Sequence, residues 1–248
     1  DRKFTLNTTT AQPSLTTDGA AALGVKEIVS SFDSAFPTDP NRTTNLTVAS
    51  NTINGTLIKP GETFSMNGVL GERTTAKGYL EGNFIADGGR LQKTVGGGVS
   101  QVSTVIYNLS WFAGVQLVEH KAHSFYISRY PAGREATVSW PDLDNKWKNT
   151  SPYGILMQMW VSGGQVHGRM WSTKWVDVTA NPGPRTNPRT PQTFTDASPT
   201  CVPMSAVPGF DITVQRVISQ GGKVIKTENY STSYLPENAV QCTGPTHS

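Results

Sequence analysis

The feature that most constrains this fold is a helix-length apolar segment that follows three glycines in VGGGVSQVSTVIYNLSWFAGV. A helix over residues 101–113 would carry apolar side chains on most of its faces, so we expect it to be buried. Gly96, Gly97 and Gly98 permit backbone angles that other residues rarely adopt, and they let a ligand or another chain segment come close. Ser100 stands where the helix would begin, either as its N-cap or as a nucleophile beside unpaired backbone amides.

Two other segments are candidates for helices. Residues 19–36 carry apolar side chains at helical spacing, between a candidate N-cap at Asp18 and a stop at Pro37, and they predict an amphipathic helix. Residues 45–58 fit either a short helix or a strand. The Asn-Gly pair within them and the Pro-Gly pair that follows are typical of turns.

The remaining chain is rich in strand signals. β-Branched and aromatic residues are concentrated in residues 115–120, 124–130 and 135–140. Two longer segments, 153–175 and 210–234, have the pattern of hairpins with Gly-Gly pairs at their turns. We therefore expect an α+β protein in which a curved antiparallel sheet packs on a few helices and is followed by a small all-β module.

Composition along the chain suggests three parts. Residues 1–180 would form the main domain. Residues 181–200 contain many prolines and almost no large apolar side chains, which is typical of a semi-extended linker. Residues 201–248 would form a small β-module, and its Cys201 and Cys242, the only cysteines of the chain, would close it with a disulfide.

The charge pattern excludes some partners. The formal net charge is +3, and the basic residues are scattered rather than clustered, so we expect no nucleic-acid binding. No apolar run is long enough to span a bilayer. Because the chain starts at Asp1 rather than Met, we expect that an N-terminal signal or anchor was removed, and membrane contact only through such an anchor. The neutral, polar composition and the cysteine pair favour an extracellular location.

Several side chains are candidates for chemistry. His123 is a candidate general acid or base, or a structural histidine in a turn. No third ligand accompanies His123 and His120 in the sequence, so we expect neither a metal nor a cofactor. Glu81 is a lone carboxylate in a segment of low charge. Arg129 and Arg134 flank a Pro-Ala-Gly turn, where they would bind a carboxylate or form a surface ion pair.

Taken together, several motifs resemble the VanW-like family of bacterial cell-envelope proteins, over roughly residues 18–162. They are PGETFSMN, the G-x-R-T-x-x-x-G-Y run, GGGVSQVST, EHKAHSFYISRYPAGREATV and DLDNKWKN. His123 and the glycines match the family pattern closely. Many relatives carry Cys where this chain has Ser100, and Asp where it has Glu135, so covalent chemistry by these two residues is less expected.

The resemblance implies a secreted or membrane-tethered envelope protein with peptidoglycan as its ligand. The first hypothesis is a binding protein without catalysis, in which the glycine loop and Gln101 form the floor of a groove and Ser100 caps the helix. Aromatic rings would stack on sugars, and arginines would hold a carboxylate. The residues in these roles would be Gly96, Gly97, Gly98, Tyr79, Tyr126, Tyr130, Trp140, Arg129 and Arg134.

Two enzymatic hypotheses accompany it. In a glycan-cleaving enzyme, Glu81 would be the general acid/base and Gln101 would position the sugar, as in a lytic transglycosylase. A hydrolase would need a second carboxylate, for which Glu72, Asp87 or Glu135 is available. In an acyl-transfer enzyme, Ser100 would act with His123 and a carboxylate such as Asp142. We favour peptidoglycan binding, with glycan cleavage as the catalytic option.

Overall fold

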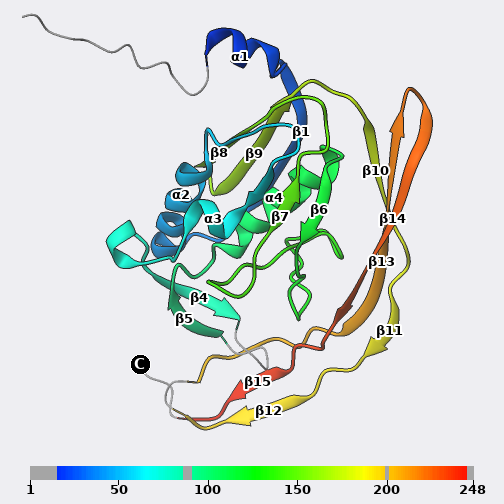
Figure 1. The fold of residues 1–248 in the computed structure, drawn as a ribbon. Coiled ribbons are helices and arrows are strands. Elements are labelled where there is room, and N and C mark those ends of the chain that lie inside the picture. The colour runs from blue at the N-terminus through cyan, green and yellow to red at the C-terminus, as the bar shows by residue number, and fades with distance from the viewer. Residues whose placement is uncertain (1–15, 86–90, 199–200, 245–248) are drawn as a thin grey trace, which may run out of the picture.

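The computed structural model describes residues 16–85, 91–198 and 201–244 and is built around a four-stranded antiparallel sheet (Figure 1). The strand order of this central sheet is β1 (Glu27–Ala35), β9 (Gln165–Ser172), β8 (Ile155–Ser162) and β2 (Leu57–Ile58). The hairpin predicted over 153–175 is confirmed as β8 and β9. Its turn holds Gly163 and Gly164 at φ of 57° and 71°, angles that favour glycine.

The helix predicted over 19–36 is wrong. The segment forms only a short α1 (Thr17–Ala22), capped by Thr16 rather than Asp18, and then strand β1. Strand β1 pairs with β9 along its length, which buries Ser34 and leaves Ile28 47% exposed. Pairing within a sheet has overridden the helical spacing of the apolar residues, because tertiary contacts outweigh intrinsic propensity.

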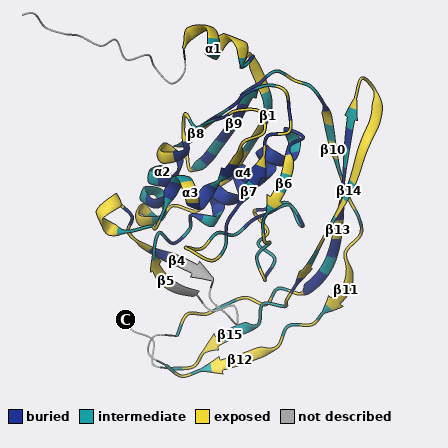
Figure 2. Ribbon diagram, viewed as in Figure 1, coloured by how far each residue is buried: buried dark blue, intermediate teal, exposed yellow. Residues whose placement is uncertain are grey.

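Two long helices cover one face of the central sheet: α2 (Pro40–Ile53) packs on β8, and α4 (Ser100–Phe112) packs on β1 and β9. Within the segment 45–58, helix α2 confirms the helical alternative up to Ile53, and the last two residues form strand β2. Helix α4 confirms the expected buried helix and is dark blue along most of its length in Figure 2. It approaches β9 closely at Gly168, where an added Cβ would lie 2.6 Å from Val105 Cγ1.

Two further small sheets and two short helices complete this part of the chain. A three-stranded sheet has the order β3 (Thr63–Ser65), β7 (Lys146–Lys148) and β6 (Gln116–Glu119), and a separate pair is formed by β4 (Glu81–Ile85) and β5 (Leu91–Val95). Two short helices, α3 (Met66–Leu70) and η1 (Thr75–Lys77), lie between β3 and β4 in the chain.

Strand β6 confirms the strand expected within 115–120, but the strands expected over 124–130 and 135–140 are wrong. These residues belong to the long loop between β6 and β7, where only isolated bridges occur, at Phe125 and Ser139. The loop packs on α4, with the Thr104 hydroxyl bonded to the backbone of Ala136. The aromatic enrichment therefore reflects burial of a loop rather than sheet pairing.

The C-terminal region forms a second antiparallel sheet. The predicted hairpin is confirmed as β13 (Gly209–Gln220) and β14 (Lys223–Tyr234), and β10 (Asp177–Pro182) and β11 (Thr186–Arg189) pair with the other edge of β13. A short parallel pair follows, β12 (Thr193–Asp196) with β15 (Ala239–Cys242).

The segment expected to be a linker without packed elements therefore contains strands β11 and β12. Its prolines are compatible with these strands, because β11 has only one partner and Pro188 lies on an edge strand, where a missing N–H breaks no ladder. The division into a domain up to residue 180, a linker and a module from residue 201 stays a prediction.

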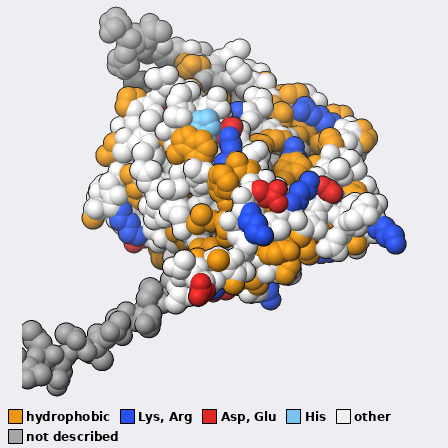
Figure 3. All heavy atoms as spheres, turned by 90° about the horizontal axis from the view of Figure 1, so that it is seen from above, with side chains coloured by type: hydrophobic (Ala, Val, Ile, Leu, Met, Phe, Trp, Pro, Cys, Tyr) orange, Lys and Arg blue, Asp and Glu red, His pale blue; other side chains and the backbone are white. Residues whose placement is uncertain are grey.

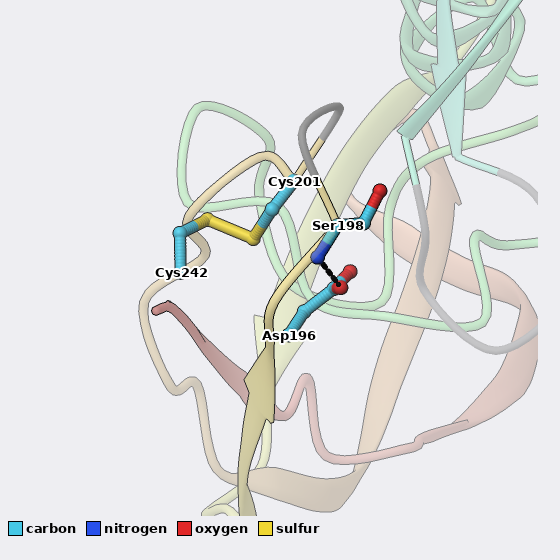
Figure 4. Close-up of a disulfide and its surroundings, with 4 residues drawn as sticks. All are labelled: Asp196, Ser198, Cys201 and Cys242. Carbon is cyan, nitrogen blue, oxygen red and sulfur yellow. Dashed lines mark hydrogen bonds between the residues drawn. A yellow bond between two sulfur atoms is a disulfide. The ribbon is translucent and has the colours of Figure 1, made fainter. Parts of the chain in front are cut away.

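The disulfide between Cys201 and Cys242 is confirmed and joins the end of β15 to the chain after β12, near the bond from Ser198 N to Asp196 Oδ1 (Figure 4).

The C-terminal hairpin and α4 share one apolar cluster. Phe210, Ile212 and Tyr234 of the hairpin pack with Tyr107 and Trp111 of the helix. The fully buried Arg216 of β13 reaches the end of α4 and donates to backbone oxygens there. The hairpin is thus held against the part of the chain that carries the candidate site.

No helix in the described part of the chain is long and apolar enough to cross a membrane. On the face drawn in Figure 3, basic side chains (blue) and acidic ones (red) lie interspersed among hydrophobic and neutral polar groups.

Candidate functional site

The long loop between β6 and β7 brings His123 and Glu135 together. His123 Nδ1 lies 2.6 Å from Glu135 Oε2, and the side chains are 13% and 0% exposed. A carboxylate can only accept, so the Nδ1–H of the imidazole donates and Nε2 is left for another partner. Within the described residues no hydrogen bond occupies Nε2. Glu135 thus contacts His123 directly, and whether either residue takes part in covalent chemistry stays a prediction.

Glu135 has a second partner from the C-terminal hairpin. The hydroxyl of Tyr234, in β14, donates to Glu135 Oε1 and accepts from the backbone N of Gly133 at 2.8 Å. Burial, and then the nearby negative charge of Glu135, raise the pKa of Tyr234, so its phenol stays protonated and remains a donor. A residue 99 positions away in the sequence therefore fixes the carboxylate that orients His123.

A cavity of about 390 Å³ opens beside this pair, between residues 120–124 and strand β14. Lys121 and Ala122 contribute to one wall, Tyr230 and Thr232 to the other, and Glu135 also lines it. Among the described residues, the lining consists of His120, Lys121, Ala122, His123, Ser124, Gly133, Glu135, Tyr230, Ser231, Thr232, Ser233 and Leu235. The cavity is polar, and it combines imidazoles, hydroxyls and one amine.

His120 lies on the inner side of this cavity. Its ring stacks on Tyr107 with centroids 4.5 Å apart, and its Nε2 is 3.0 Å from the Tyr107 hydroxyl. Burial lowers the pKa of His120, because the charged imidazolium would lose its hydration, so this ring stays neutral near pH 7. His120 therefore offers a neutral polar group to the cavity.

The glycine loop serves the protein's own packing. An added Cβ at Gly97 would lie 2.1 Å from the backbone oxygen of Gly82, and one at Gly98 would lie 3.1 Å from Nη1 of Arg42. Gly96 and Gly98 have φ of 80° and 96°. The close approach expected of a ligand at this loop is made instead by β4 and α2, so the loop does not form the floor of a groove.

Gln101 is also used internally and is 0% exposed. Its Nε2 donates to Ser34 Oγ at 2.8 Å and to the backbone oxygen of Ala35 at 2.9 Å, and its Oε1 accepts from Arg42 Nη2 at 2.6 Å. The amide is saturated by protein groups, so the expectation that Gln101 positions a ligand is wrong.

Ser100 is not the cap of α4. The N-cap is Val99, which makes no side-chain capping bond, and Ser100 is the first helical residue. Its Oγ accepts from the backbone N of Val138 at 3.3 Å. In the described residues no hydrogen bond links Ser100 to His123, whose carboxylate partner is Glu135 rather than the exposed Asp142.

Glu81 stands apart from this site. It is exposed at the start of β4, where its backbone oxygen accepts from Asn41 Nδ2, and it does not line the cavity. Glu81, Gln101 and His123 therefore lie in three different environments rather than in one groove. Asp87 falls outside the described residues, and the role of Glu81 in glycan cleavage stays a prediction.

The predicted sugar-stacking tyrosines are mostly enclosed. Tyr79 is 1% exposed and Tyr130 is 4% exposed, and Tyr130 stacks on His123 with centroids 5.4 Å apart. Burial raises the pKa of Tyr130 to about 12. Tyr126 packs edge-on against Phe210 and Tyr234. Tyr130 and Tyr126 thus pack against His123 and Tyr234 of the site, whereas Tyr79 belongs to the main core.

The two predicted carboxylate-binding arginines differ in environment. Arg134 donates to Asn108 Oδ1 at 3.0 Å and lies over the ring of Phe112, and burial lowers its pKa. Arg129 is exposed, with its guanidinium 5.5 Å from the centroid of Tyr130. Sequence reasoning missed Lys121, Tyr230 and Tyr234, because nothing local marks them and only the docking of β14 brings the two tyrosines to the loop.

A family model described as "VanW like protein" matches residues 41–171. The chain is 33% identical over 152 residues to "Uncharacterized protein YoaR" of Bacillus subtilis, which covers 61% of this chain and 50% of that protein. It is 30% identical over 129 residues to "Vancomycin B-type resistance protein VanW" of Enterococcus faecalis, covering 49% and 45%.

The chain thus spans about half the length of the curated relatives it matches. No solved structure matches it. The family match includes His123 and Glu135 but ends before β10, so Tyr230 and Tyr234 lie beyond it.

Proposed function

Because this chain belongs to the VanW-like family, we propose that it is a cell-envelope protein that binds peptidoglycan in the cavity between residues 120–124 and β14. The observation that carries the proposal is the polar cavity beside the His123–Glu135 pair. A relative bears the name of a vancomycin resistance protein, which supports a role at the cell wall.

The chemistry of the cavity fits the peptide part of peptidoglycan. Lys121 is exposed at the cavity and provides a cation for a peptide carboxylate. The neutral His120, Tyr230 and Thr232 provide partners for amide and hydroxyl groups. Among the residues that the structure describes, Glu135 is the only carboxylate that lines the cavity, and its oxygens are bonded to His123 and Tyr234, so it would repel an anionic ligand little.

Filling the cavity should weaken this binding. We expect Ala122→Trp to lower co-sedimentation with purified sacculi by about tenfold, because the indole would occupy the ligand's volume. Ala76→Trp, an exposed site on η1 outside the cavity, is the matched control and should bind like the wild type. Wild-type protein that stays entirely in the supernatant would refute the proposal.

A second candidate function is acyl transfer on cell-wall peptides, favoured by the orientation of His123. The hydroxyl proton of Ser100 would pass to His123 Nε2 while Ser100 Oγ attacks the carbonyl carbon of a peptide bond, and Glu135 would stabilise the resulting imidazolium. The imidazolium would then give this proton to the leaving amine as the C–N bond breaks, which leaves the acyl group on Ser100 as an ester. The N-terminus of α4, where Ser100 is the first residue, favours the developing negative charge on the carbonyl oxygen.

Labelling with a fluorophosphonate probe tests this second function. We expect the wild type to be labelled, Ser100→Ala to lose labelling, and Glu135→Gln to label at least about 100-fold more slowly, because an amide would hold the wrong imidazole tautomer. Ser124→Ala, at a serine that lines the cavity, serves as the control. Equal labelling of the wild type and Ser100→Ala would exclude Ser100 as the nucleophile.

A further inference from the structure

The outer face of the central sheet carries two tryptophans in a set of fixed polar side chains. Helices α2 and α4 cover the inner face, to which Val166, Gly168 and Met170 of β9 point. The alternate residues of β9, and those paired with them on β1 and β8, are partly or fully exposed. This face, which we call the tryptophan face, comprises Asp33, Gln158, Trp160, His167, Arg169 and Trp171.

Both indoles are held in place by their neighbours. Trp160 stacks on the cross-strand His167 with centroids 4.8 Å apart and an interplanar angle of 15°, and the guanidinium of Arg169 lies 5.3 Å from its centroid. Trp171 Nε1 donates to Gln158 Oε1 at 2.8 Å. A ring that is already fixed loses little conformational entropy when a ligand stacks on it.

The polar groups of the face are equally constrained and their charges balance. Arg169 donates through both terminal nitrogens to the two oxygens of Asp33, at 2.7 and 3.2 Å. The bond from Arg169 is the main cause that lowers the pKa of Asp33, so this side chain is a charged acceptor and remains 36% exposed. One carboxylate against one guanidinium gives the face no net charge to attract a polyanion or an anionic lipid surface.

We infer that the tryptophan face is a second binding surface, separate from the cavity, and that it takes the glycan strand of the cell wall. A pyranose ring presents C–H groups to an aromatic face and hydroxyl or acetamido groups at its edge, and this face offers indoles beside oriented donors and acceptors. Trp160 and Trp171 lie four positions apart along the paired strands, about 14 Å at the usual rise, so they would contact different sugars of one strand.

This inference rests on the proposed function, from which it takes its ligand. It assigns the two parts of peptidoglycan to two separate sites. The cavity would take the peptide, and the tryptophan face would take the glycan. The tyrosines expected from the sequence to stack on sugars are enclosed, whereas Trp160 and Trp171 belong to the hairpin that the sequence identified only as structural.

The test uses the full chain and a soluble β-1,4-linked oligomer of N-acetylglucosamine, which contains no peptide, in isothermal titration calorimetry. We expect the wild type to bind and Trp160→Ala/Trp171→Ala to bind about tenfold more weakly. Trp160→Phe/Trp171→Phe should recover most of the affinity. Phe194→Ala removes an aromatic ring that is 50% exposed on β12, outside the central sheet, and should have no effect.

Each outcome decides the inference separately from the proposed function. Failure of the wild type to bind the oligomer, or equal binding by the double alanine variant, would overturn the inference while the cavity variant Ala122→Trp still tests binding of intact sacculi. The inference is also wrong if the double alanine variant no longer binds sacculi while the wild type does not bind the oligomer. The face would then bind a peptide. A third outcome is that the oligomer binds at the tryptophan face but Ala122→Trp does not change the binding of sacculi. This outcome would support the inference and refute peptidoglycan binding in the cavity.

Discussion

Replacing Arg216 with alanine is expected to lower the free energy of unfolding by about 3–5 kcal/mol, the range for removing one member of a buried charged network. Arg216 is 0% exposed and donates to the backbone oxygens of Ser110, Trp111 and Val115. Its Nη1 also lies 3.0 Å from Glu228 Oε2. Without the guanidinium, the carbonyls at the end of α4 would be buried without donors.

Urea denaturation under non-reducing conditions, followed by circular dichroism, measures this change. Arg216→Lys keeps the charge but not the planar fork of donors, so we expect it to recover only part of the loss. Arg185→Ala is the control, because Arg185 is exposed and lies over Tyr126 and Phe210, where about 1 kcal/mol or less is expected. A loss below about 1 kcal/mol for Arg216→Ala would contradict the assignment of Arg216 as the tie between α4 and β13.

Gly97→Ala is expected to destabilise the protein by about 3 kcal/mol or more, at the upper end of overpacking effects. The added Cβ would lie 2.1 Å from the oxygen and 2.3 Å from the carbon of the Gly82 carbonyl. Both contacts are with backbone, so no side-chain rotation can relieve them. The backbones of Gly97 and Gly82 would have to move apart. This movement would also weaken the bond from Asn45 Nδ2 to the oxygen of Gly97.

Gly221→Ala separates this steric effect from backbone strain. Gly221 has φ of 56° in the β13–β14 turn and open space around its Cβ position, so its substitution should cost only about 1–2 kcal/mol. Gly97 has no positive φ, and its cost would come from the clash. Equal midpoints in urea for Gly97→Ala and the wild type would show that β4 does not approach the glycine loop as described.

The outcome for α4 and the hairpins shows which patterns sequence reasoning handles well. Residues 101–113 are apolar on most faces, and such a segment has few folded alternatives to a buried helix. The segments 153–175 and 210–234 combine alternation with Gly-Gly turns, so local geometry fixes both the strands and their pairing. In each case the decisive information lies within one short segment.

The errors arose where distant pairing decided the structure. Residues 27–35 have apolar spacing compatible with a helix, but β9 offers them a ladder of backbone bonds across the sheet. The loop segments 124–130 and 135–140 are rich in strand-forming residues, yet the loop instead places Tyr130 against His123 and Ala136 against α4. Propensity describes a segment alone, whereas these outcomes depend on what packs beside it.

Some residues of the candidate site could be selected from the sequence, and others could be selected only from the structure. His123 could be selected from the sequence because a histidine among aromatic and acidic residues is suited to proton transfer and hydrogen bonding. Its partner could not, since Glu135 and Asp142 are both near it in sequence and only the loop geometry chooses Glu135. The glycines and Gln101 were selected for a ligand role that the core itself fills.

By itself the sequence determined the buried helix α4, the two hairpins, the disulfide pair and the family to which the chain belongs, because each depends on local pattern or on motifs in order. Only the tertiary structure decided that Tyr234 reaches Glu135, that Arg216 caps α4 and that Trp160 and Trp171 share an open face. These contacts join residues far apart in the chain, and their energies come from burial and hydrogen-bond geometry that no single segment encodes.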